Sequence, residues 1–196
     1  MVVRHAPVFV ITGPSGAGKG TLIKALVERI PVLEVAISAT TRPQRPGETD
    51  GVEYHFLGEE TFVRQIEEGA FLEHVEYVSG KRYGTLQSEM QRVAAGGHVC
   101  VLELELDGAR RVQESVPGSV TLFIAAPVEE LERRLRDRAT ESTGEIGARI
   151  ELARHQLEQA HNFRYMVRND DVERATGSLC AIVEQELEFA ATMTPS

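Results

Sequence analysis

The chain has 196 residues, of which 42% are hydrophobic, and carries a formal net charge of −9 at pH 7. This length and apolar content suit one α/β domain with insertions better than two independent domains, and the acidic balance argues against a general nucleic-acid binder. No stretch is long and apolar enough to cross a bilayer and no signal peptide is visible, so we expect a cytoplasmic protein with no membrane partner.

A phosphate-binding loop, residues 13–21, is predicted near the start of the chain. Its sequence, Gly-Pro-Ser-Gly-Ala-Gly-Lys-Gly-Thr, follows four residues of high strand propensity, 9–12, and precedes a helical pattern that reaches Arg29. The glycines let backbone N–H groups converge on an anion, and Lys19 has the spacing at which a lysine reaches the outer phosphates of a nucleotide. Gly20 departs from the motif, which has a hydroxyl residue there. The alternative is a flexible glycine turn, which the flanking strand and helix disfavour.

The next part of the chain, residues 38–88, predicts a small strand-rich insertion on the α/β core. Residues 35–37 indicate a short buried strand that leads into residues 38–48, whose two arginines and several hydroxyls suit an anion. An ordinary solvated loop is the alternative for that segment. Beyond it we expect an edge strand, a short amphipathic helix closed by a glycine, and a second alternating stretch, over residues 53–57, 61–68 and 71–77.

A compact apolar run at residues 99–102 predicts a buried parallel strand, after a helix over residues 86–95. The run contains Cys100, and we expect both Cys100 and Cys180 to be buried thiols. With only Cys180 besides, the chain has too few cysteines for a disulfide framework or a zinc site.

Two acidic residues, Glu103 and Glu105, follow this apolar run. On a continuing strand they point the same way, because alternate residues of a strand share a face. They also lie at the end of the strand where open α/β sheets bind ligands. Exposed acids at a strand end are the alternative interpretation. We expect Asp107 to cap a helix over residues 108–116.

A polar, glycine-bearing segment, residues 138–149, predicts a mobile flap. It follows a buried strand over residues 120–124 and a helix on which Arg134 and Arg138 share one face. A flap bounded by Arg138 and Arg149 would exclude water and neutralise a transferring phosphoryl group. Taken singly, each arginine is better explained as a solvated helix residue. The chain then closes with a helix, a short strand and a long helix, which end near residues 160, 168 and 189.

Five motifs in this order resemble those of guanylate kinases along nearly the whole chain. They are Gly-Pro-Ser-Gly-Ala-Gly-Lys, Thr-Thr-Arg-Pro-Gln-Arg-Pro-Gly-Glu, Phe-Leu-Glu, Tyr-Gly-Thr and Asn-Asp-Asp, at residues 13–19, 40–48, 71–73, 83–85 and 169–171. The resemblance implies an α/β P-loop kinase core with a parallel sheet flanked by helices, a small strand-rich GMP-binding insertion and a mobile lid. It divides one domain into three parts. The core covers residues 1–37, 89–137 and 150–196, the GMP-binding insertion covers residues 38–88, and the lid covers residues 138–149.

The activity that this resemblance implies is transfer of the γ-phosphate of ATP to GMP, and by extension to dGMP, with Mg²⁺ as cofactor. ATP and GMP would be the partners, in purine nucleotide metabolism. Both a monomer and a homo-oligomer are consistent with the sequence.

The resemblance also implies a role for each matching residue. ATP binding is assigned to Gly13, Pro14, Ser15, Gly16, Ala17, Gly18, Lys19, Gly20, Thr21 and, beside the adenine, Asn169. The GMP phosphate is assigned to Ser38, Arg42, Arg45, Tyr54 and Tyr83, and the guanine to Glu73, Thr85 and Glu105. The residues expected to act in phosphoryl transfer are Lys19, Arg42, Arg134, Arg138 and Arg149. No firm direct protein ligand of the metal is implied, and contacts through water are expected from Glu103 and Thr21.

The sequence departs from the family pattern at two places. Glu103 and Glu105 replace aspartates that are usual after the buried strand, and each is one methylene longer. Gly20 gives the Gly-Lys-Gly-Thr form that is typical of adenylate kinases. Glu73 and Thr85 favour guanine, because its N1–H and exocyclic amine are donors and its O6 is an acceptor, which a carboxylate and a hydroxyl complement.

Two other functions compete with this interpretation. A related P-loop kinase would phosphorylate a different acceptor, such as AMP or a sugar phosphate. A non-catalytic scaffold on the same fold would bind phosphorylated peptides in the arginine and tyrosine pocket. Such scaffolds have typically lost the working phosphate loop, so Lys19 and the lid arginines favour an enzyme.

Overall fold

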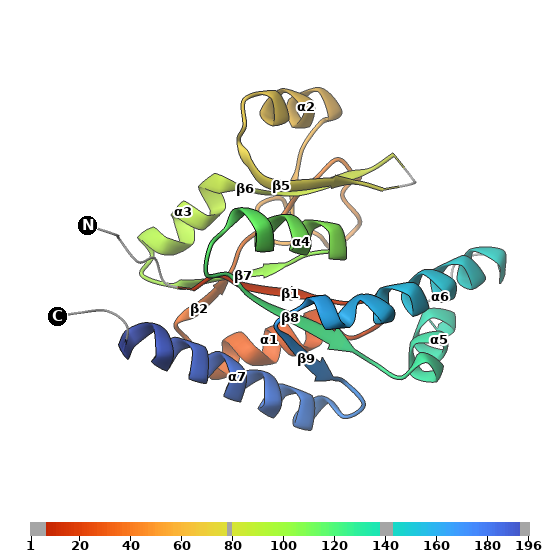
Figure 1. The fold of residues 1–196 in the computed structure, drawn as a ribbon. Helices are drawn as coiled ribbons and strands as arrows, with labels where there is room; N and C mark the ends of the chain where they lie inside the picture. The colour runs from red at the N-terminus through yellow and green to blue at the C-terminus, as the bar shows by residue number, and fades with distance from the viewer. Residues whose placement is uncertain (1–6, 78–79, 138–142, 193–196) are drawn as a thin grey trace.

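The computed structural model describes residues 7–77, 80–137 and 143–192, which form two β-sheets and the helices around them (Figure 1). The central sheet has five strands in the order β2-β7-β1-β8-β9, and every neighbouring pair is parallel. The strands are β1 (Phe9–Thr12), β2 (Leu33–Val35), β7 (Val99–Glu103), β8 (Val120–Ala125) and β9 (Tyr165–Arg168). The predicted parallel sheet is confirmed, and the carboxyl ends of its strands all lie at the same end of the sheet.

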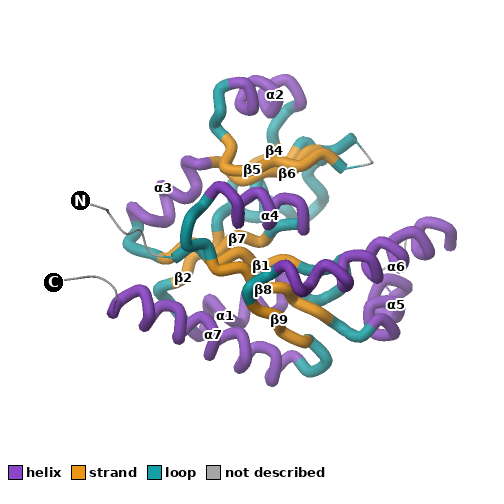
Figure 2. Tube along the Cα trace, viewed as in Figure 1, coloured by secondary structure: helices purple, strands orange, loops and turns teal. Residues whose placement is uncertain are grey.

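Helices cover both faces of the central sheet (Figure 2). One face carries α1 and α7, over Lys19–Arg29 and Val172–Thr192. The other face carries α3 and α4, over Gln87–Ala95 and Leu106–Ser115. At one end of the molecule α5 and α6 pack on each other, over Val128–Asp137 and Thr143–Glu158, and a 3-10 turn over Gln159–Asn162 leads back to β9. Among the described residues, no helix combines the length and the apolar character needed to cross a membrane.

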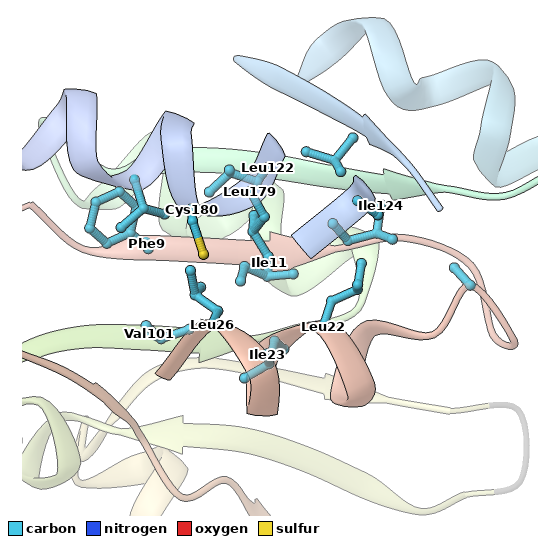
Figure 3. Packing of buried hydrophobic residues seen from close by; sticks show 14 of the residues in the cluster. Phe9, Ile11, Leu22, Ile23, Leu26, Val101, Leu122, Ile124, Leu179 and Cys180 are labelled. Carbon is cyan, nitrogen blue, oxygen red and sulfur yellow. The ribbon is translucent and has the colours of Figure 1, made fainter. Parts of the chain in front are cut away.

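The central strand β1 divides the core because its side chains alternate between the two faces. Phe9 and Ile11 pack with Leu22 of α1 and Leu179 of α7 (Figure 3). Val10 points the other way, into the cluster that includes α4. Burial on both faces explains why the strands read as continuous apolar runs rather than as alternating ones.

Both cysteines are buried and free, as predicted. Cys180 packs among the residues of Figure 3, whereas Cys100 lies on the opposite face of the sheet. Burial raises the pKa of the Cys100 thiol to about 12, so this thiol is un-ionised at neutral pH and unreactive.

The insertion forms the second sheet, with four strands in the order β4-β3-β6-β5. Its elements are β3 (Ala39–Thr40), β4 (His55–Phe56), α2 (Glu59–Glu67), β5 (Phe71–Glu76) and β6 (Arg82–Leu86). The expected edge strand is confirmed at β4, and the amphipathic helix at α2. Phe62 of α2 stacks on Phe71 of β5 with ring centres 4.4 Å apart, so the helix closes a small core of its own. Gly69 ends this unit with a φ of 67°.

Three local predictions differ from the structure. The strand expected at residues 35–37 ends at Val35. Asp107 does not begin α4: the helix starts at Leu106, whose buried side chain packs on the core, and Glu105 is its N-cap residue. Within the flap segment, residues 143–149 belong to α6, and residues 138–142 lie outside the described part of the chain.

Candidate functional site

The phosphate loop connects β1 to α1 at the carboxyl edge of the central sheet. Gly13, Gly16 and Gly18 have φ angles of 142°, 86° and 85°, which side chains rarely tolerate. At Gly13 the constraint is also steric, because a Cβ there would lie 2.2 Å from the backbone oxygen of Ile124 on β8. The loop therefore lies directly on the sheet, and it brings the positive N-terminal end of α1 to the sheet edge.

Lys19 is the first residue of α1, and only 9% of its surface is exposed. Its Nζ donates hydrogen bonds to the oxygens of Gly13 and Pro14, at 2.7 and 3.4 Å. An ammonium group has three donors, so one remains for a phosphate oxygen. Gly20 faces open space, since no described atom lies within 4 Å of a Cβ placed on it, and Thr21 is exposed.

Two residues from distant elements hold the phosphate loop in place. Asn169, which is 1% exposed, donates from Nδ2 to the Ala17 oxygen at 2.7 Å. Arg134 on α5 donates from Nη1 to the Gly16 oxygen at 3.1 Å. A Cβ on Gly18 would lie 2.5 Å from the Asn169 amide nitrogen, so this contact requires glycine. The structure thus brings to the loop, from elements far along the chain, the predicted ATP-binding residue Asn169 and Arg134, which was predicted to act in phosphoryl transfer.

A cleft of about 480 Å³ opens between the phosphate loop, the insertion and α6. Its lining includes eight of the predicted site residues, Ser15, Ser38, Tyr54, Glu73, Tyr83, Glu103, Glu105 and Arg149. The described site residues that do not line it are the rest of the phosphate loop, Arg42, Arg45, Thr85, Arg134 and Asn169. Arg138 lies outside the described residues.

Glu73 and Thr85 are partners across β5 and β6. The pairing register shifts between Phe71 and Glu73, and a bulge of this kind changes the direction of the side chain that follows it. Both side chains are buried, with 5% of Glu73 exposed and 1% of Thr85. Burial raises the pKa of the Glu73 carboxyl, and the polar groups of Thr85 and the charge of Arg111 oppose that rise. The pair forms a buried polar site, and Glu73 brings it to the wall of the cleft.

Three tyrosines of the insertion gather beside this site. The ring centres of Tyr54 and Tyr83 are 6.0 Å apart, and those of Tyr77 and Tyr83 are 5.0 Å apart. The guanidinium of Arg42 lies 5.2 Å from the centre of the Tyr54 ring. Burial raises the pKa of Tyr54, so its hydroxyl stays protonated at neutral pH and remains a donor for an anion.

Arg42 is fixed by a two-point ion pair with Glu48. Its Nη1 and Nη2 lie 2.9 Å from the two carboxylate oxygens, and Nη1 also donates to the Pro43 oxygen at 2.8 Å. The Glu48 carboxylate accepts a further hydrogen bond from the backbone N–H of Arg45 at 2.8 Å. The bonds from Arg42 hold the pKa of Glu48 below its usual range. Arg42 also interacts with the Tyr83 hydroxyl, and because a guanidinium has five N–H donors, one can still serve a ligand phosphate.

The two glutamates after β7 both line the cleft, but they belong to different elements. Glu103 ends β7, whereas Glu105 is the N-cap residue of α4, so the prediction of one continuing strand is wrong. The chain leaves the strand after Glu103 because Leu104 and Leu106 both pack in the core, and α4 begins at Leu106. The Glu103 residue is exposed at the cleft, yet partial desolvation there raises the pKa of its carboxyl, while the charge of Lys19 lowers it. Glu103 therefore lies within electrostatic reach of the phosphate loop.

The oxygen ligands available near the phosphate loop fit a magnesium ion that is held mainly by nucleotide phosphates. Within the described residues, no group of three or more His, Cys, Asp or Glu side chains could hold a metal ion by itself. The Glu103 carboxylate and the exposed Thr21 hydroxyl are oxygen donors, which Mg²⁺ prefers. Mg²⁺ at such sites takes one or two protein ligands and completes its shell with phosphates and water.

Some lining residues were not predicted, although two patterns in the sequence point to them. Tyr77, the residue after β5, lies four positions beyond Glu73 in the alternating stretch of residues 71–77, and both residues line the cleft. Leu152 and Gln156 lie three and seven positions beyond Arg149, on one face of α6. The start of α6 was not predicted because the residues before Arg149 are mostly polar and include glycine.

The family model for guanylate kinase matches residues 5–186. The chain belongs to the guanylate kinase family. The guanylate kinase of Frankia casuarinae is 45% identical over 89% of this chain and 95% of its own length. That of Rubrobacter xylanophilus is 43% identical over 93% of this chain and 96% of its own length. The solved structure of guanylate kinase from Anaplasma phagocytophilum aligns with a TM-score of 0.73 at 26% identity, over 93% of this chain and 86% of that one.

Proposed function

We propose that this protein transfers the γ-phosphate of ATP to GMP, and also to dGMP, and so forms GDP for purine nucleotide metabolism. The observation that carries the proposal is one cleft that extends from Ser15 of the phosphate loop to the buried Glu73 of the insertion. A donor nucleotide on the loop and an acceptor nucleotide on the insertion would meet inside this cleft. Holding both reactants in one orientation accounts for much of the rate enhancement in such a transfer.

The acceptor site would read guanine through buried polar groups. The Glu73 carboxylate accepts from the N1–H and the exocyclic amine of guanine, and the Thr85 hydroxyl complements O6. Glu105, the N-cap residue of α4, would accept from the same amine. Adenine would leave these buried groups without partners, which is the most effective basis for rejecting it.

The acceptor phosphate would lie among the hydroxyls and arginines of residues 38–54. Ser38, Tyr54 and Tyr83 line the cleft, and the Arg42 guanidinium lies beside the Tyr54 ring. Arg45 is exposed at the same loop, where it would supply a second positive charge. Arginine suits this role because its planar fork matches two phosphate oxygens.

The donor site would use the amides of residues 13–21, with Lys19 on the outer phosphates and Thr21 at the start of α1. The Asn169 amide oxygen is buried, and it finds no hydrogen-bond partner among the residues that the structure describes. An unpaired buried acceptor is costly, and the adenine amine is a donor that would satisfy it. This supports a place for the adenine beside Asn169.

The reaction would be a direct in-line displacement without a phosphoenzyme. No general base is required, because the acceptor oxygen belongs to a phosphate that is already ionised. The protein's part is to position both nucleotides and to surround the transferring group with cations, from Lys19, Arg42, Arg134, Arg138 and Arg149. A bound Mg²⁺ would neutralise charge on the ATP phosphates, near Glu103 and Thr21. Residues 138–149 would act as the lid that excludes water.

A coupled assay of nucleoside diphosphate formation tests this function directly. The full chain is supplied with ATP, Mg²⁺ and one of GMP, dGMP, IMP, AMP or UMP. We expect GMP and dGMP to be phosphorylated, and AMP to react at least about a thousandfold more slowly, because the guanine-reading groups would be left unpaired. A preference for AMP would favour the related-kinase alternative. Absence of turnover together with binding of a phosphopeptide would favour the scaffold.

A further inference from the structure

The Glu73 carboxylate lies directly against the first turn of α4. An ideal Cβ built on Gly108, the third residue of that helix, would lie 2.6 Å from Glu73 Oε2 and 3.2 Å from its Cδ. Real Cβ atoms essentially never approach another atom within 3.0 Å. The backbone at Gly108 is ordinary helix, so no unusual φ angle requires glycine there. The Glu73 carboxylate is therefore the group that would have to shift if a side chain were added at Gly108.

The backbone of β5 is held on both sides next to Glu73. Arg111, one turn further along α4, donates from Nη1 to the carbonyl oxygen of His74, which follows Glu73 in the strand. On the neighbouring strand, a Cβ on Gly84 would lie 2.7 Å from the Glu73 backbone oxygen, so β6 is packed closely against the same residue. With its backbone held between α4 and β6, Glu73 would have to accommodate any added group through its side chain.

The first turn of α4 also suits a carboxylate electrostatically. The N–H groups of a helix's first turn carry partial positive charge, and the N-cap residue Glu105 makes no side-chain capping bond with them within the described residues. A nearby carboxylate is stabilised by that charge. The same turn thus carries Glu105 and supports Glu73, the two carboxylates assigned to guanine.

We propose that Gly108 is a specificity-positioning residue, whose missing side chain lets the Glu73 carboxylate rest on α4 in the orientation that reads guanine. This inference rests on the proposed base-reading role of Glu73. Gly108 itself would not touch the nucleotide. Its effect would pass through Glu73, and the spacing between Glu73 and Glu105 would depend on it.

The test compares Gly108→Ala with Gly177→Ala in the full chain. Both glycines are helical, but at Gly177 no atom of the described residues lies within 4 Å of an added Cβ. Alanine is favoured over glycine in helices, so Gly177→Ala should leave kinetics unchanged and stability equal or higher. We expect Gly108→Ala to raise the KM for GMP about tenfold or more, because a hydrogen bond to a charged group is misplaced. The KM for ATP should stay unchanged, kcat should change by less than about threefold, and the preference for GMP over IMP should fall.

A second pair of variants separates this role from a purely structural one. In a Glu73→Ala background the carboxylate that meets the new Cβ is gone, so Gly108→Ala should add less than about a twofold further change in KM. The inference would be overturned if Gly108→Ala raised the KM for GMP by the same factor in both backgrounds. It would also be overturned if Gly108→Ala alone had the KM of the wild type. If Gly108→Ala fails to fold, the double variant must fold for the inference to stand, and its failure to fold overturns it. If Glu73→Ala alone leaves KM and acceptor preference unchanged, the base-reading role itself fails, which is a distinct result.

Discussion

Lys19 makes its hydrogen bonds inside the loop that it is proposed to serve. Bonds to the oxygens of Gly13 and Pro14 fold the side chain over the loop and keep it largely buried. A lysine held in this way loses little further side-chain entropy when a phosphate arrives. Its charge also lies close enough to lower the pKa of Glu103, which is the electrostatic link between loop and cleft.

Replacing this residue, in Lys19→Ala, should remove most turnover. We expect kcat to fall roughly a hundredfold or more, because a positive charge aimed at the transferring group is lost. Binding of GMP, measured by calorimetry, should stay within about threefold of the wild type, since the acceptor site lies in the insertion. Lys24→Ala, an exposed lysine further along α1, is the matched control and should behave as wild type. Normal turnover in Lys19→Ala would contradict the loop assignment.

At the scale of elements, the loop between β3 and β4 is ordered around one carboxylate. The Glu48 carboxylate accepts hydrogen bonds from Nη1 and Nη2 of the Arg42 guanidinium and from the backbone N–H of Arg45. The ion pair is largely shielded, with side-chain exposures of 13% for Arg42 and 18% for Glu48, so it is less screened than an ordinary surface pair. The loop therefore holds Arg42 against the Tyr54 ring without help from a ligand.

Glu48→Gln should weaken this arrangement while leaving the chemistry intact. The amide cannot accept at both ends, so Arg42 gains alternative orientations and the KM for GMP should rise about fivefold to twentyfold, with a smaller change in kcat. Steady-state kinetics with GMP as the varied substrate measure this. Glu60→Gln, which alters an exposed carboxylate on α2, serves as the control. An unchanged KM for GMP would show that Arg42 does not depend on Glu48.

Elements with a strong local pattern could be predicted from the sequence, and those shaped by packing could not. The strand at residues 165–168 and the glycine-bearing loop were predicted at their observed positions. The start of α6 was missed because its first turns are polar and its helical order is supported by burial of Ile150 and Ala153 against other elements. The sequence of residues 143–149 gives no indication that Ile150 and Ala153 are buried against other elements.

The same distinction holds within the candidate site. The motif containing Glu73 led to a residue at the cleft, as did the acid pair after β7. The close approach of Glu73 to Gly108 joins residues that are far apart in the chain, and glycine in a helix gives no indication of it by itself. Tyr77 could have been found from the period of two along β5.

At the scale of the whole molecule, Glu89 on α3 joins the insertion to the core. It accepts a hydrogen bond from the Ile37 backbone at 2.9 Å, lies 3.1 Å from Nε2 of His55 on β4, and pairs with Arg92. Arg92 also reaches Glu34 on β2. This network spans the junction between the two sheets, so it sets how the insertion sits over the phosphate loop.

The network predicts a pH-dependent contribution to stability. Burial alone would raise the pKa of Glu89, but hydrogen bonds from Arg92, Ile37 and His55 outweigh it and hold the pKa below its ordinary value of 4.5. A carboxyl whose pKa is lowered on folding stabilises the protein above pH 4.5, and that stability is lost as the pH falls through the folded-state pKa. Glu89→Gln should therefore lower the free energy of unfolding by roughly 1–3 kcal/mol at neutral pH.

Urea unfolding of Glu89→Gln and the wild type between neutral and acidic pH measures this contribution. The deficit of the variant should shrink below about pH 4.5, because the wild type then loses its own carboxylate. Glu28→Gln, an exposed site on α1, should show no such deficit. A deficit that stays constant across the range would contradict the ionised role of Glu89.

The central claim is that the insertion recognises guanine through Glu73 while the loop supplies the donor phosphate. The most direct measurement is the ratio of kcat/KM for GMP to that for AMP, in the wild type and in Glu73→Ala. We predict that the ratio falls about a hundredfold or more in the variant, chiefly through loss of kcat/KM for GMP, because the carboxylate that pairs with guanine is gone. An unchanged ratio, with both acceptors affected equally, would contradict the account.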